Sequence, residues 1–139
     1  MISCKEIDDY LRWVDSNPDK VNEARKLLIK NIVKPTLARN DVFFDKEMYQ
    51  KCIKYCEKNY YNLFPYQKFV YAFVFMYVDD IPLFPTVIIL MGRGNGKDGF
   101  MMPLMNFLQT PIYGIKNYHI DIIANNESQA KDSFNVVYE

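Results

Sequence analysis

The chain has 139 residues, half of them apolar, with 11 tyrosines and 10 phenylalanines. This composition suits a folded protein and excludes a disordered chain, while the length excludes two large domains. The 17 basic and 17 acidic residues balance, so net charge by itself indicates neither a nucleic-acid partner nor a membrane surface.

The three cysteines, Cys4, Cys52 and Cys56, are interpreted as buried free thiols in a reducing compartment. Cys52 and Cys56 are one helical turn apart, but a zinc site needs further ligands and the single histidine, His119, is distant in sequence. The N-terminus lacks the pattern of a signal peptide. The longest apolar stretch has about ten residues, whereas a membrane-spanning helix needs about twenty. We therefore expect a cytoplasmic protein with no membrane partner.

Residues 1–62 are expected to form a helical leader. Ser3 followed by Glu6 is typical of a capping box, and the first helix should end at Asn17. Pro18 is predicted to open a second helix, which Pro35 should close. The apolar face predicted for this second helix consists of Val21, Ala24, Leu27, Leu28 and Ile32.

A third helix is predicted to begin at Asp45, whose carboxylate suits an N-cap. Its predicted inward residues are Met48, Cys52, Ile53 and Cys56. Another side carries a row of lysines, which we interpret as a solvent-exposed face rather than a phosphate contact: Lys51, Lys54 and Lys58. A fourth helix, rich in Phe and Tyr, is predicted from Pro65 to about Val78.

The pattern changes after Pro85 from helices to alternating strands and helices. The continuous apolar run at residues 86–91 is rich in β-branched residues, which predicts a strand buried on both faces. A second strand is predicted at residues 119–124. The order strand, helix, strand, helix is typical of an α/β sheet. Because two strands rarely form a stable parallel sheet, we expect the chain to be the front part of a longer protein.

A helix is predicted after each of these strands. The first runs from Lys97 to about Leu108, and Pro103 inside it should produce a kink or an early end, because its ring collides with the Gly99 carbonyl and it has no N–H to donate. The second is predicted to be capped by Asn126 together with Gln129. Its predicted inner face consists of Ala130, Phe134, Val137 and Tyr138.

Between the first strand and its helix stands a turn that indicates phosphate binding, with the sequence Gly92-Arg93-Gly94-Asn95-Gly96-Lys97. Small residues let backbone N–H groups surround a phosphate, and a helix start adds partial positive charge. Lys97 should contact the β- and γ-phosphates, with Arg93 as a second cation. The alternative is a plain glycine turn. The usual pattern is G-x-x-x-x-G-K-[ST], from which this turn departs at Met91 and Asp98.

Asp98 stands where a serine or threonine would bind magnesium. Its carboxylate has three possible roles, which the sequence leaves open: to bind Mg²⁺ directly or through water, to repel the triphosphate, or to stabilise the first turn of the helix.

The turn resembles the variant phosphate loop of the large terminase subunit of tailed bacteriophages, which often reads R-G-N-G-K-S. Upstream, Leu63-Phe64-Pro65-Tyr66-Gln67-Lys68-Phe69 looks like the adenine-side motif of that family. Downstream, residues 122–130 resemble a strand and helix with an A-x-x-x-x-Q-A stretch. The three matches lie in the family's order and cover residues 63–139, while residues 1–62 match only as a helical leader.

The resemblance implies a P-loop NTPase-type parallel sheet, truncated here, with residues 63–139 as the first part of an ATPase domain. Family members are motors that hydrolyse ATP to move double-stranded DNA into a procapsid, and they carry a nuclease that cuts it. By resemblance, Lys97 and Arg93 are the catalytic residues, Gln67 reads adenine and Tyr66 packs on the base. The residues implied to bind ATP and its Mg²⁺ are Tyr66, Gln67, Gly92, Arg93, Gly94, Asn95, Gly96, Lys97 and Asp98. Implied partners are DNA, a small terminase subunit or portal, and further copies of the chain, in a bacterial host's cytoplasm.

The sequence departs from the family in two respects. Asp98 replaces the magnesium-binding serine or threonine, and the Walker B strand and nuclease acids are missing. Asp79 and Asp80 imitate Walker B but precede the loop, so we interpret them as a helix end or loop. We therefore expect weak nucleotide binding and poor hydrolysis by this chain alone. Two other interpretations are a different P-loop ATPase or small-molecule kinase, and a non-catalytic interaction module left by a prophage.

Overall fold

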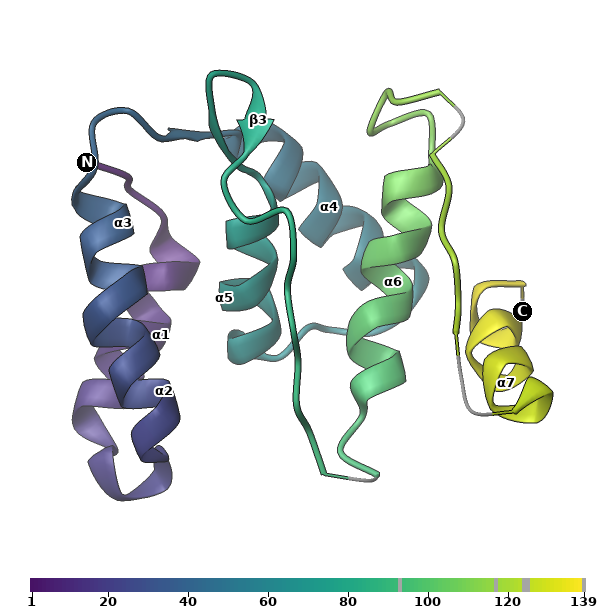
Figure 1. Ribbon diagram of the computed structural model, residues 1–139, viewed down its shortest axis with the longest axis horizontal. Coiled ribbons are helices and arrows are strands. Elements are labelled where there is room, and N and C mark those ends of the chain that lie inside the picture. The colour runs from purple at the N-terminus through teal and green to yellow at the C-terminus, as the bar shows by residue number, and fades with distance from the viewer. Residues whose placement is uncertain (93, 117, 124–125, 139) are drawn as a thin grey trace. The chain divides into compact units, whose positions relative to one another are not determined.

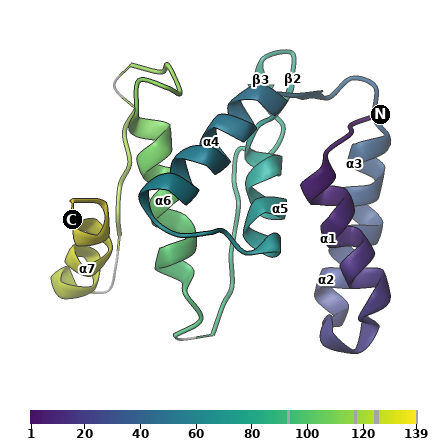
Figure 2. The same ribbon diagram turned by 180° about the vertical axis from the view of Figure 1, so that it is seen from behind.

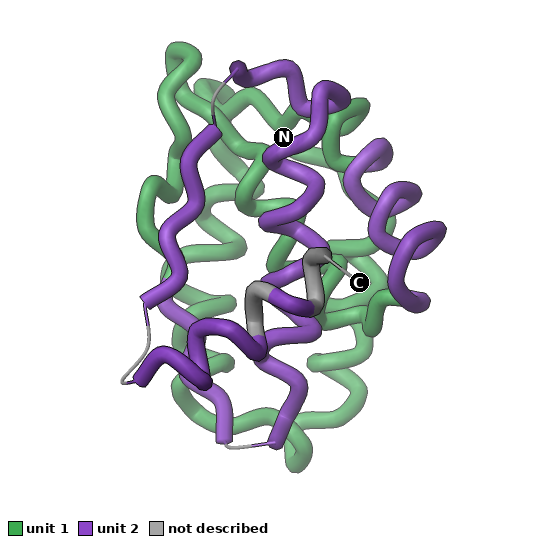
Figure 3. Tube along the Cα trace, turned by 90° about the vertical axis from the view of Figure 1, so that its right-hand side faces the viewer, with its two compact units in different colours: residues 1–49, 63–87 green, residues 50–62, 88–139 purple. Residues whose placement is uncertain are grey.

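The computed structural model describes residues 1–92, 94–116, 118–123 and 126–138; beyond residue 132, it describes only the side chain of residue 135. The chain divides into two compact units that alternate along the sequence, residues 1–49 with 63–87, and residues 50–62 with 88–139 (Figure 3). One of these boundaries falls where the sequence analysis divides leader from ATPase domain, and that domain assignment stays a prediction. Among the described residues, no helix combines the length and apolar character needed to cross a bilayer.

The first unit is mainly helical (Figure 1). Its helical elements are α1 (Lys5–Ser16), the 3₁₀ turn η1 (Pro18–Lys20), α2 (Glu23–Leu28), the π-helical turn η2 (Ile29–Val33), α3 (Lys34–Ala38) and α5 (Pro65–Val74). Helix α1 packs against α5, and the rings of Tyr10 and Phe69 lie 4.4 Å apart between centroids. The N-cap of α1 is Cys4 and makes no side-chain cap, so the predicted capping box at Ser3 is wrong.

The predicted end of the second helix at Pro35 is also wrong, because the chain remains helical from Glu23 to Ala38. Within this stretch, the N–H of Lys34 bonds to the carbonyl of Ile29, five residues back. Such a widened turn is one of the ways in which a helix accommodates a break in its regular hydrogen-bond ladder, and Pro35 produces this break by lacking an N–H. The helix begins at Glu23 rather than at Pro18, which opens the 3₁₀ turn η1 instead. Its N-cap is Asn22, whose side chain accepts from the N–H of Arg25 at 2.9 Å.

The apolar face predicted for this helix is confirmed only at Val21, which is buried. The structure buries Ile29, Val33 and Thr36 instead. The remaining predicted residues are exposed: Ala24, Leu27, Leu28 and Ile32. The sequence carries two apolar stripes at helical spacing, and periodicity alone selects the wrong one.

The only sheet in the described part of the chain is antiparallel and belongs to the first unit. Its strands are β1 (Phe43–Phe44), β2 (Met76–Val78) and β3 (Ile81–Pro82), with Phe43 opposite Tyr77 and Val78 opposite Ile81. Asp79 and Asp80 form the turn between β2 and β3, with φ of 50° and 63°. Paired positive φ values are typical of two-residue hairpins. The loop assignment of both aspartates is thus confirmed, whereas the preceding helix ends at Val74 rather than Val78.

Helix α4 (Lys46–Asn59) begins in the first unit and continues in the second. The predicted cap is confirmed, since the Met48 N–H donates to Oδ1 of Asp45 at 3.1 Å. The second unit also contains α6 (Lys97–Gln109) and α7 (Glu127–Tyr138), which pack against each other (Figure 2). The predicted cap of α7 is confirmed by a 3.0 Å bond from the Gln129 N–H to Asn126.

The core of the second unit lies between α4 and α6. The ring of Tyr55 on α4 lies 5.6 Å from that of Phe107 on α6. The predicted burial of Cys52, Ile53 and Cys56 is confirmed. Helix α6 buries Phe100, Met102, Leu104, Phe107 and Leu108. Of the inner face predicted for α7, Phe134, Val137 and Tyr138 lie outside the described side chains.

The two segments predicted as parallel strands are not regular strands where the structure describes them, at residues 86–91 and 119–123. Several of their apolar side chains are exposed, including Leu90 at 93% and Ile123 at 92%. A strand is defined by hydrogen bonds to neighbouring strands, and neither segment has such pairing in the described part of the chain. The parallel P-loop sheet stays a prediction.

Candidate phosphate-binding site

The glycine-rich turn has the backbone geometry that its sequence predicts. Gly94 and Gly96 have φ of 79° and 77°, a left-handed conformation that strains residues with a side chain. The turn is closed by a 3.3 Å hydrogen bond from the Asn95 N–H to the Gly92 carbonyl. A Cβ on Gly92 would lie 2.9 Å from the side-chain nitrogen of Asn95, so this glycine leaves room for its neighbour.

The turn leads directly into helix α6, with Gly96 as the N-cap and Lys97 as the first helical residue. The N–H of Phe100 makes a 2.9 Å bond to the Gly96 carbonyl. The first N–H groups of a helix have no partner within the helix, and they carry partial positive charge. Gly96 has no side chain with which to cap them, so this end of α6 is suited to an anion.

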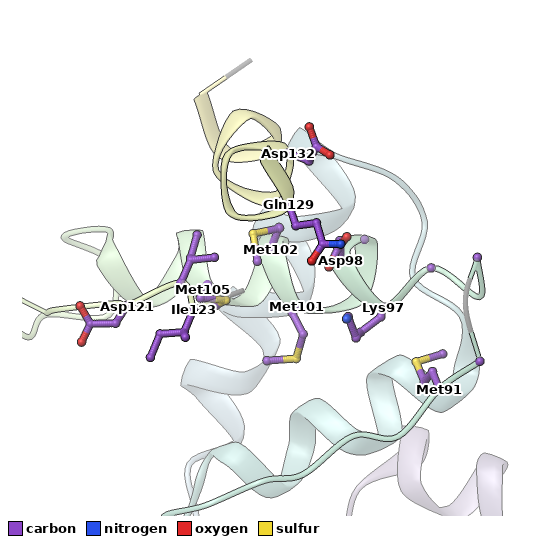
Figure 4. A pocket seen from close by; sticks show the side chains of 15 residues that line it. Met91, Lys97, Asp98, Met101, Met102, Met105, Asp121, Ile123, Gln129 and Asp132 are labelled. Carbon is purple, nitrogen blue, oxygen red and sulfur yellow. The ribbon is translucent and has the colours of Figure 1, made fainter. Parts of the chain in front are cut away.

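The turn opens on a cavity of about 810 Å³ within the second unit, bounded by α6, residues 121–123 and α7 (Figure 4). Lys97 and Met101, one turn apart, project from the same side of α6. Four methionines supply an apolar lining: Met91, Met101, Met102 and Met105. The lining also includes the carboxylates of Asp98, Asp121 and Asp132. The cavity therefore combines one ammonium group, acidic groups and a flexible apolar surface.

The structure brings most of the predicted loop residues to this cavity. Its lining includes Gly92, Gly94, Gly96, Lys97 and Asp98, and Asn95 closes the turn. Arg93 lies outside the described residues, as do Ala124 and Asn125 of the downstream motif. No group of three metal-binding side chains of the kind that holds an ion occurs in the part of the chain that the structure describes.

The residues predicted to recognise adenine lie in the first unit, whereas the glycine turn lies in the second. Gln67 is 2% exposed, and its Oε1 accepts from the Phe64 N–H at 2.8 Å, which caps α5. Tyr66 is half-buried and stacks on Phe64, with ring centroids 6.2 Å apart and planes 7° apart. Phe64 is 60% exposed, so the pair presents an aromatic surface.

The cysteines have the environment of structural thiols. All three are free and buried, as the sequence predicts. The hydrogen bond with Cys56, together with burial, raises the pKa of Cys52 far above its usual range. Since the thiolate is the form that attacks electrophiles and binds metals, Cys52 is inert at neutral pH.

Two residues that contact α6, Tyr60 and Tyr61, were not predicted from the sequence. Tyr61 donates a hydrogen bond from its hydroxyl to the carbonyl of Gly99, and the side-chain amide of Asn106 donates to the hydroxyl of Tyr60 at 2.5 Å. The one signal in the sequence was Pro103, which deprives the Gly99 carbonyl of its helical donor.

Comparisons of the chain with known protein families, curated proteins and solved structures find no match. The terminase resemblance therefore rests on the motifs themselves, at residues 63–69, 92–97 and 122–130.

Proposed function

We propose that the chain binds ATP through the glycine turn at residues 92–97, as the N-terminal part of a phage DNA-packaging ATPase. The observation that carries the proposal is the left-handed Gly96 followed at once by Lys97 at the start of α6. Gly96 and Lys97 both line the cavity, so the start of α6 and an ammonium group border the same space, which suits a polyphosphate.

Each loop residue has a distinct role in this proposal. The N–H groups of the turn and of the first turn of α6 surround the phosphates, and Lys97 neutralises the β- and γ-phosphates. Arg93 stabilises the γ-phosphate, a role assigned from the sequence resemblance. Asp98 lines the cavity and is proposed to contact the Mg²⁺ that accompanies ATP, through water. Recognition of the base by Tyr66 and Gln67 also rests on the resemblance.

For the parent protein we propose ATP hydrolysis coupled to movement of double-stranded DNA into a procapsid, followed by cutting. Its partners would be DNA, a small terminase subunit or portal, and further copies of itself, in the bacterial cytoplasm. The second candidate is a non-catalytic module of prophage origin. It is favoured by Asp98 at the position where a serine or threonine would bind magnesium.

Titration with a fluorescent ATP analogue and Mg²⁺ tests nucleotide binding. Lys97→Ala should weaken binding at least about tenfold, because hydrogen bonds to charged groups contribute about 1.5–3 kcal/mol and about 1.4 kcal/mol corresponds to tenfold. Lys116→Ala is the matched control, since this exposed lysine does not line the cavity. Equal affinities for wild type and Lys97→Ala, or no binding at all, would contradict the proposal.

The motor function is tested with the full-length parent. Turnover of ATP that DNA stimulates, and that Lys97→Ala abolishes, is the expected result. Binding of ATP without any turnover would favour the non-catalytic module, and phosphorylation of a small metabolite would favour a kinase.

A further inference from the structure

Helix α6 contains an interior proline close to the candidate site. Pro103 has no N–H, so the carbonyl of Gly99, four residues earlier, lacks its regular helical donor. Gly99 is only two residues after Lys97 and itself lines the cavity. The defect therefore falls in the turn of α6 that carries the proposed phosphate ligands. Despite it, the helix continues to Gln109.

A hydroxyl from another part of the same unit occupies the position of the missing donor. The chain leaves α4 at Asn59 and runs beside α6 (Figures 1 and 2), where Tyr61 donates a hydrogen bond from its hydroxyl to the Gly99 carbonyl. A Cβ at residue 99 would lie 3.2 Å from this hydroxyl oxygen. Glycine at this position thus gives Tyr61 access to the backbone.

The neighbouring tyrosine contacts α6 farther along. The side-chain amide of Asn106 donates to the Tyr60 hydroxyl at 2.5 Å. Tyr60 therefore contacts the last turn of the helix, whereas Tyr61 contacts its first turn. Only the Tyr61 bond is made to a backbone atom that Pro103 leaves without its donor.

We propose that Tyr61 is a positioning residue for the phosphate site, and that its hydroxyl replaces the N–H that Pro103 lacks. This inference rests on the proposed function, since the geometry that Tyr61 maintains is that of Lys97 and the first N–H groups of α6. With the bond in place, these groups are ordered before ATP arrives. Without it, part of the binding free energy is spent on ordering the first turn.

The substitution Tyr61→Phe removes only the hydroxyl, and Pro103→Ala supplies an N–H that can donate to the Gly99 carbonyl. On the wild-type background, Tyr61→Phe should weaken binding of ATP and Mg²⁺ by roughly fivefold or more, the effect of losing one backbone hydrogen bond. Pro103→Ala should stay within about twofold of wild type. In the double variant, the affinity for ATP should return to within about twofold of the wild-type value, because the N–H of residue 103 can now donate to the Gly99 carbonyl.

Tyr60→Phe is the matched control. It removes the same group one residue away, and Pro103→Ala should not rescue its effect, whatever its size, because its partner is a side chain. If the effect of Tyr61→Phe is the same with and without the Pro103→Ala substitution, or if Pro103→Ala rescues Tyr60→Phe equally well, the inference is overturned.

Amide hydrogen exchange in the same proteins separates this inference from the proposed function. The N–H groups at residues 100–102, which follow the unpaired first N–H groups of the helix, should exchange faster in Tyr61→Phe and be protected again in the double variant. Should wild type bind no ATP while this exchange pattern holds, the proposed function fails and Tyr61 positions only the helix. Unchanged exchange in Tyr61→Phe overturns the positioning role whether or not ATP binds.

Discussion

Replacing Gly96 with alanine tests whether the left-handed turn is needed for phosphate binding. Gly96 has φ of 77°, and a Cβ added there meets no atom within 4 Å. The substitution therefore causes no collision, and its whole effect is the conformational cost of an L-residue in the left-handed region. That cost is about 1–2 kcal/mol.

The cost must be visible in one of two quantities. If the alanine variant retains the turn, its free energy of unfolding falls by about 1–2 kcal/mol. If the turn relaxes instead, binding has to restore it, and the affinity for ATP falls by a factor of roughly 5–30, which corresponds to the same free energy. A mixture of the two effects should add up to a similar total.

Gly114 provides a matched control within the same unit. Its φ is 84°, a Cβ there also meets nothing within 4 Å, and it does not line the cavity. Urea unfolding and ATP titration of Gly96→Ala and Gly114→Ala should show that only the former weakens binding. The reasoning is refuted if Gly114→Ala weakens binding equally, or if Gly96→Ala changes neither stability nor affinity.

Three further predictions concern the fold. Asp45→Ala, which removes the cap of α4, should lower the free energy of unfolding by about 1 kcal/mol in urea titrations. Leu90→Ser should change it by less than about 0.5 kcal/mol, because Leu90 is 93% exposed, and a loss of several kcal/mol would instead indicate the buried strand predicted from sequence. Burial raises the pKa of Cys4 from 9.0 to about 11, so its thiol stabilises the fold fully below about pH 9, and this contribution is lost as the pH rises toward 11. The stability difference between wild type and Cys4→Ser should therefore shrink over that range, and a constant difference would contradict the assignment.

Some signals that act over a few residues were predicted well from the sequence, although the capping box at Ser3 and the helix end at Pro35 were not. Asp45 and Asn126 cap their helices because each accepts a hydrogen bond from an N–H three residues later, a partner that chain connectivity guarantees. The glycine turn and the start of α6 at Lys97 were also predicted, because they too depend only on residues that are close in sequence. This local half of the candidate site is therefore predictable from residues 92–97 alone.

Signals that depend on distant neighbours were predicted less well. Leu27 and Val33 belong to different apolar stripes of one helix, and the partner surface decides which stripe is buried. The run at residues 86–91 has the composition of a strand buried on both faces. Strand formation also requires neighbouring strands to pair with, and the composition of a segment does not show whether they are present.

Pro103 shows how a distant residue can supply a hydrogen-bond donor that a local defect removes. The sequence predicted a kink or an early end, because a helix-interior proline lacks a donor and crowds the carbonyl four residues earlier. The helix does not end early but continues for six residues beyond Pro103, to Gln109, and the compensating hydroxyl belongs to Tyr61, 38 residues before Gly99. Because the Pro103 defect and its compensation by Tyr61 act on Gly99, two residues after Lys97, they also link the end of α4 to the candidate phosphate site. Substitutions at Tyr61 should therefore affect nucleotide binding without any contact between Tyr61 and the nucleotide.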